Sequence, residues 1–89
     1  MKAQSVFSVV RKQVLKQMRP IVHASKTRAS MIHRMESMVD ELARLECTKE
    51  LMIFSQEDAD DIKKELTPRF HAYYDKLHPM DVTLNLLLN

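Results

Sequence analysis

The chain of 89 residues contains no glycine at all and a single cysteine. Phosphate-cradling loops, dinucleotide-binding turns, EF-hand loops and nucleophile elbows all use glycine for backbone conformations with positive φ. The absence of glycine therefore argues against these classes of enzyme and binding site. Cys47 cannot form a disulfide within the chain, so a reducing cytoplasm is the expected compartment. We expect no cofactor and no metal.

Aromatic residues are also scarce, and they are not interleaved with basic residues, so stacking on single-stranded bases is poorly supported. Of the 89 residues, 26 are charged, which is typical neither of a membrane span nor of a disordered tail. The apolar residues near the N-terminus are interrupted every third or fourth position by bases, unlike those of a signal peptide. We expect one soluble domain without membrane contact.

Charge is divided unevenly along the chain. Residues 1–35 hold eight bases and no acid, whereas residues 36–66 hold ten acids against four bases. Such a split indicates either internal packing of basic on acidic segments or two faces for two partners. The stretch 11–30 also has the composition of a mitochondrial transit peptide, but its apolar residues run on into the helices behind it, which disfavours a cleaved leader.

The apolar periodicity predicts helices over most of the chain. A first helix should bury one arc of apolar side chains and should bend or end near Pro20, since proline cannot donate to the helical ladder. A second helix should start near Ser30, end near Cys47 and bury a seam with steps of four and three residues. The first arc is Val6, Phe7, Val10, Val14, Leu15 and Met18, and the seam is Met31, Met35, Met38, Leu42 and Leu45, with Ile32 and Val39 beside it.

A third helix should start at Ser55, which with Asp58 has the spacing of a capping box. Its apolar stripe continues past Thr67 and Pro68, so one kinked helix or two helices would satisfy the pattern. We favour a break, with Thr67 as the cap and Pro68 at the first helical position. Leu51 to Phe54 should be a short apolar connector.

These elements predict one all-α domain over residues 1–89, a small bundle of three to four helices with a kink or break at Pro20 and Pro68. The expected segments are a basic N-terminal helix (1–30), the Met/Leu seam helix (31–47), an acidic helix with the Pro68 helix (55–78) and a leucine-rich tail (79–89). The tail alternates apolar and polar residues and would be costly to leave in water, so it should dock on this chain or on a partner.

Two patterns suggest chemistry, and each has a plainer interpretation. His71, Asp75 and His78 share one helical face and could approach a metal ion, but histidines near a helix C-terminus are favoured by the helix dipole anyway. Cys47 and His33 would lie about 21 Å apart on one helix, too far for a nucleophile and its base. We therefore expect no catalytic residues, and a structural thiol at Cys47.

In size, helix content and basic N-terminal half, the whole chain resembles small bacteriophage proteins that bind and redirect host enzymes. Within that group it looks most like the lambdoid-phage modulators of the host RecBCD recombination nuclease, with Thr67-Pro68 as a proline inside an otherwise helical run. The resemblance is one of overall features rather than of a motif. It implies a non-catalytic protein on the nuclease complex, inhibiting or activating it, and Thr67-Pro68 as a site for a host prolyl isomerase.

The sequence therefore predicts a non-enzymatic cytoplasmic interaction protein that docks on a larger nucleic-acid-processing host enzyme. The alternative is a nucleic-acid-binding regulator that uses the basic half on phosphates and forms a homodimer through the Met31 to Leu45 seam. A small metal-dependent enzyme is a distant third interpretation. The basic face could also simply be solvated. The expected partner-binding residues are Arg11, Lys12, Lys16, Arg19, Lys26, Arg28, Pro68, Leu84, Leu86 and Leu88.

Overall fold

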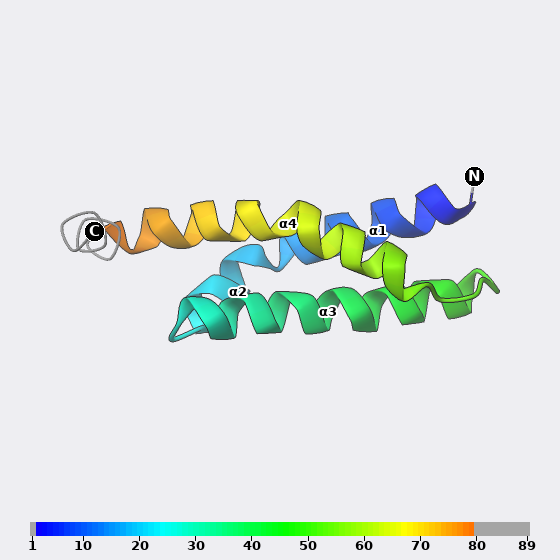
Figure 1. Cartoon of the computed structure of the whole chain (residues 1–89), viewed down its shortest axis with the longest axis horizontal. Helices are drawn as coiled ribbons and strands as arrows, with labels where there is room; N and C mark the ends of the chain where they lie inside the picture. The colour runs from blue at the N-terminus through cyan, green and yellow to red at the C-terminus, as the bar shows by residue number, and fades with distance from the viewer. Residues whose placement is uncertain (1, 80–89) are drawn as a thin grey trace.

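Four helices make up the computed structural model of this chain, which describes the backbone of residues 2–79 and the side chains of residues 6–79. They are α1 (Lys2–Lys16), α2 (Met18–Ala24), α3 (Arg28–Lys49) and α4 (Gln56–Leu77). These residues include no strand, which confirms the all-α prediction. α1 and α2 run along α3, and α4 returns along these three helices (Figure 1). The result is an elongated bundle of 50 × 23 × 18 Å.

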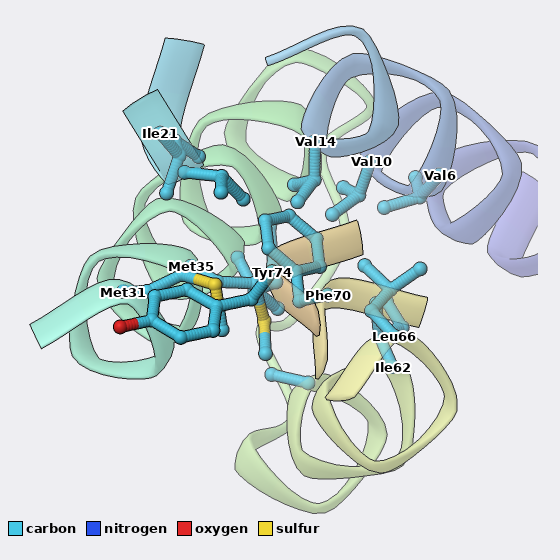
Figure 2. Packing of buried hydrophobic residues seen from close by; sticks show 14 of the residues in the cluster. Val6, Val10, Val14, Ile21, Met31, Met35, Ile62, Leu66, Phe70 and Tyr74 are labelled. Atoms are coloured by element: carbon cyan, nitrogen blue, oxygen red, sulfur yellow. The ribbon is translucent and has the colours of Figure 1, made fainter. Parts of the chain in front are cut away.

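The core is built from rows of apolar side chains three or four residues apart, together with an adjacent pair on α2. α1 supplies Val6, Val10 and Val14, α2 supplies Ile21 and Val22, α3 supplies Met31, Met35, Val39, Ala43 and Cys47, and α4 supplies Ala59, Ile62, Leu66, Phe70 and Tyr74. Figure 2 shows Phe70 at the centre, with the valines of α1 pointing toward it and toward Leu66. Each large side chain removed from water contributes about 1.5–3 kcal/mol.

The break between α1 and α2 lies at Gln17, close to where Pro20 predicts it. Pro20 has no N–H for the carbonyl of Lys16 four residues earlier, and its ring would clash with that carbonyl. α1 therefore ends at Lys16, and Pro20 falls in the first turn of α2, where a missing donor costs nothing. The apolar arc predicted for this segment is confirmed, with its valines buried and Phe7, Leu15 and Met18 packed against them.

The seam helix begins earlier and ends later than predicted, at Arg28 and Lys49. The backbone N–H of Ser30 donates to Oγ1 of Thr27 over 3.0 Å, which makes Thr27 the N-cap and Ser30 part of the first turn. The sequence prediction took Ser30 as the start because the first seam residue follows it directly. The true cap lies three residues before.

The predicted seam is correct for its first half and wrong at its end. Met31 and Met35 are fully buried, but Leu45 is 50% exposed, and the buried row continues through Ala43 and Cys47. A strict row of four-residue steps slopes around the helix, whereas a four-three alternation stays along one side. Both α1 and α4 pack on α3, so the sloping row is the one covered.

The break predicted at Thr67 and Pro68 is wrong, because α4 is one helix from Gln56 to Leu77 with Pro68 in its interior. The hydroxyl of Thr67 donates to the carbonyl of Lys63 over 2.7 Å instead of capping a new helix. In Figure 1 the axis of α4 changes direction in its middle stretch, drawn yellow. A bend lets the apolar row stay on the core although the backbone loses one hydrogen bond.

Candidate partner-binding surfaces

The uneven charge of the sequence becomes a separation between the two ends of the molecule. One end holds α2, the start of α3 and the end of α4, and the other holds the end of α3, the following turn and the start of α4 (Figure 1). Residues 18–34 carry four bases and no acid, while residues 40–65 carry nine acids against four bases. The first is the basic end and the second is the acidic end.

Four of the predicted partner-binding bases are exposed and form no ion pair with another described residue. They follow one another from the second half of α1 to the turn before α3, and we call them the basic surface: Lys12, Lys16, Arg19 and Lys26. Their charges are therefore available to a ligand or partner.

The other two predicted bases, Arg11 and Arg28, are engaged within the chain. The guanidinium of Arg28 donates to Nδ1 of His71 over 2.9 Å and forms an ion pair with Asp75. Its Cζ also lies 4.6 Å from the centroid of the Tyr74 ring, a cation–π contact. Arg28 thus ties the start of α3 to the end of α4, and its role is structural in this conformation.

The same contacts decide how His71, Asp75 and His78 are used. Arg28 occupies the space between His71 and Asp75, and the ring of His78 stacks on Tyr74 with centroids 4.2 Å apart. Among residues 2–79, no three His, Cys, Asp or Glu side chains are grouped to hold a metal ion. Cys47 is buried in the core, in agreement with a structural thiol.

A groove of about 500 Å³ lies between α1 and α4 and joins bases that are distant in sequence. Its lining residues are Ser8, Arg11, Lys12, Leu15, Glu65, Leu66 and Arg69. Nε of Arg11 lies 2.5 Å from Oε2 of Glu65, an ion pair. The N–H is not directed at that oxygen, however, and this buried donor forms no hydrogen bond with a described residue. We call this feature the α1–α4 groove.

Two further grooves have balanced charge. The one between α1 and α3, about 330 Å³, is lined by Gln13, Lys16, Gln17, Met38, Glu41 and Leu42. The one between α3 and α4, about 260 Å³, is lined by Glu36, Asp60, Lys63, Lys64 and Thr67. The α1–α4 groove differs from both in holding three bases against one acid.

Acidic groups at the α3–α4 junction surround one lysine. Nζ of Lys63 lies 2.9 Å from Oδ1 of Asp40 and 3.2 Å from Oδ1 of Asp60. Partial burial acts to lower the pKa of Lys63, but hydrogen bonds to both carboxylates outweigh it and raise the pKa above 10.5. Hydrogen bonds from Gln56 and Lys63 lower the pKa of Asp60. This cluster is a structural tie between the helices.

The turn after α3 exposes two large apolar side chains, Leu51 (95%) and Ile53 (94%). They alternate with Met52 and Phe54, which pack on the core, and Arg44 covers the Phe54 ring at 4.1 Å. This segment is the apolar connector that the sequence predicted. Leu51 belongs to the turn, with a φ of 56°, whereas Ile53 points away from the core between Met52 and Phe54, as the two-residue period of an extended segment requires.

The other predicted residues are exposed, buried or outside the described part of the chain. Pro68 is exposed on α4, and the Thr67-Pro68 bond lies within the helix. Leu84, Leu86 and Leu88 lie outside the described residues. Met31 and Met35 are buried within a single chain, so this half of the seam is not available for the predicted homodimer. Arg69 was missed because no local pattern relates it to Arg11.

No family model matches this chain, and neither the curated proteins nor the solved structures include a match. Of the helices that the structure describes, none is both long and apolar enough to cross a membrane.

Proposed function

We propose that this chain is a non-catalytic interaction protein whose basic surface docks on an acidic surface of a larger nucleic-acid-processing host enzyme and modulates it. The resemblance to phage modulators of the recombination nuclease suggests the kind of enzyme. The proposal assigns docking to Lys12, Lys16, Arg19 and Lys26, and leaves Arg11 and Arg28 in their ion pairs within the chain.

One observation carries this proposal: the bases are divided into engaged and available groups. Arg11, Arg28, Lys49 and Lys63 each form an ion pair with a carboxylate of this chain. The four bases of the basic surface form no ion pair with a described residue, although Glu41 shares a groove with Lys16 and Glu65 shares one with Lys12. Exposed charges of one sign steer association with a surface of the opposite sign.

The experiment is a capture from bacterial lysate with tagged protein after nuclease treatment, so that nucleic acid cannot bridge the proteins. The unmodified chain should retain a nucleic-acid-processing complex, identified by mass spectrometry. Reversing Lys16, Arg19 and Lys26 to Glu should abolish that capture and leave helicity intact, because all three side chains are exposed.

The matched control reverses three other exposed bases, Arg34, Lys64 and Lys76, to Glu. Both variants change the net charge by the same amount, but the control leaves the basic surface intact. Capture that is lost equally in both variants would show an effect of net charge alone. Capture that persists unchanged in the first variant would show that the basic surface is only solvated.

A further inference from the structure

The α1–α4 groove joins three bases, two of them arginines, on the walls of one concave surface. Arg11 and Lys12 come from α1, and Arg69 comes from α4, more than fifty positions later in the chain. Glu65 is the one acid among the lining residues. We propose that this groove binds the phosphate groups of a nucleic-acid backbone. It shares Lys12 with the basic surface, whereas Arg11 and Arg69 belong to the groove alone.

The lining suits a phosphate ester better than a base. Arginine presents a planar fork of donors that matches phosphate oxygens, and Ser8 adds a hydroxyl. No aromatic side chain lines the groove, so it offers no platform for stacking and no means of reading sequence. The expected binding is therefore sequence-independent and decreases with salt.

The ion pair between Arg11 and Glu65 is one that a ligand can replace. It is half exposed, with 40% and 50% of the two side chains accessible, and water screens such a pair. The Nε donor forms no hydrogen bond with the residues that the structure describes. A phosphate oxygen could take the place of the carboxylate and satisfy this donor, and Glu65 would then compete with the ligand.

Further positive charge lies beyond the groove, on the basic surface. Lys16 follows Lys12 by about one turn of α1, and Arg19 lies just past the break at Gln17. Bases that extend past the groove favour a long polyanion over a small anion. A nucleic acid or an acidic peptide is such a polyanion. The pair of arginines in the groove favours the nucleic acid, because phosphate offers each fork two oxygens on one tetrahedral centre.

The test is fluorescence anisotropy of a labelled duplex DNA of random sequence, titrated with the full chain over a series of salt concentrations. Arg69→Gln should weaken binding and reduce the slope of log K against log salt by about one. Lys64→Gln is the control, since it removes the same charge from the same helix but lies in the α3–α4 groove. Glu65→Gln should tighten binding by releasing Arg11.

Circular dichroism of each variant confirms that the helices are retained, so that a loss of binding reports on the groove. Equal weakening by Arg69→Gln and Lys64→Gln would overturn the proposal in favour of a diffuse positive field. So would absence of binding at low salt, or a Glu65→Gln variant that binds no tighter. Displacement of the DNA by polyglutamate as readily as by unlabelled DNA would reassign the groove to acidic peptides.

Discussion

Leu51 shows how a chain without glycine closes a helix. Its φ is 56°, in the left-handed region, where glycine is the usual residue. The N–H of Leu51 donates to the Thr48 carbonyl over 3.2 Å, and that of Met52 donates to the Cys47 carbonyl over 2.8 Å. These two bonds form a complete Schellman motif, so the local strain at Leu51 is offset by satisfied carbonyls at the end of α3.

Leu51→Gly should stabilise the protein by up to about 1 kcal/mol, because glycine adopts the left-handed conformation without a Cβ penalty. The greater entropy of glycine in the unfolded chain reduces this gain. Leu51→Ala is the control, since it keeps the Cβ and removes only a side chain that is 95% exposed. Denaturant unfolding of both variants gives the comparison. A stabilisation of equal size in both would mean that the side chain, not the backbone, is the cause.

Two positions on α3 distinguish the observed buried row from the predicted seam. Met35→Asp should cost about 4 kcal/mol or more, because the residue is fully buried and the carboxylate would have no partner. Leu45→Asp should change stability by no more than about 0.5 kcal/mol, since half of that side chain is already in water. Thermal melting of the two variants tests this, and unfolding by Leu45→Asp would restore the predicted seam.

Among the elements, α4 depends most on its neighbours. Pro68 removes the N–H that would bond the carbonyl of Lys64, and an isolated helix would break there. Leu66, Phe70 and Tyr74 are buried on both sides of the proline, and the free energy of this burial exceeds the cost of one lost hydrogen bond. Tertiary packing thus overrides a strong local signal.

Pro68→Ala should stabilise the chain by about 1–3 kcal/mol, because alanine restores the backbone hydrogen bond in a helix interior. A proline at a helix start would instead lose its preset φ on substitution, with a small loss of stability. Denaturant unfolding separates the two results by sign. If Pro68→Ala instead destabilised the protein, the result would indicate two separate helices that meet at Pro68.

The cluster of Asp40, Asp60 and Lys63 predicts how stability depends on pH. The pKa of Lys63 is raised in the folded state, so its contribution is complete below pH 10.5 and is lost as the pH rises through the folded value. The pKa of Asp60 is lowered, so its contribution is present above pH 3.8 and is lost as the pH falls through the folded value.

Lys63→Met should therefore cost about 1 kcal/mol near neutral pH and progressively less above pH 10.5, where the unmodified chain also loses the charge. Unfolding in denaturant at several pH values measures the difference between the two proteins. A difference that stays constant into the alkaline range would mean that the methylene chain of Lys63, rather than its charge, stabilises the junction.

At the scale of the whole molecule, the antiparallel path of α3 and α4 produces the separation of charge. The bases of α2 and the start of α3 lie beside the end of α4, and the acids of α3 and α4 meet at the opposite end (Figure 1). The small net charge of +2 is therefore the sum of a basic end and an acidic end. A partner approaching along the long axis meets a basic or an acidic surface depending on the end it approaches.

We expect weak end-to-end association at low ionic strength, because the basic end of one copy attracts the acidic end of another. The attraction should disappear at about 0.15 M salt, where the screening length is about 8 Å. Sedimentation at several protein and salt concentrations measures it. Reversal of Arg19, Lys26 and Arg34 to Glu should abolish it, since all three are exposed at the basic end. Association that strengthens with salt would indicate the exposed Leu51 and Ile53 instead.

The sequence by itself determined the helical class, the burial of the first apolar arc, the break near Pro20 and the cap at Ser55. It did so because helical periodicity and capping depend on residues within one or two turns of each other. The N–H of Asp58 does donate to Oγ of Ser55, over 3.3 Å. The sequence did not predict the left-handed turn that Leu51 makes without glycine.

Only the tertiary structure decided which bases are available and which surfaces they form. The engagement of Arg28 by His71 and Asp75, and the meeting of Arg69 with Arg11, depend on where α4 crosses the other helices. The exposure of Leu45 and the continuity of α4 through Pro68 depend on two neighbours packing on α3. Contacts between residues forty or more positions apart are set by packing geometry, which no local pattern in the chain encodes.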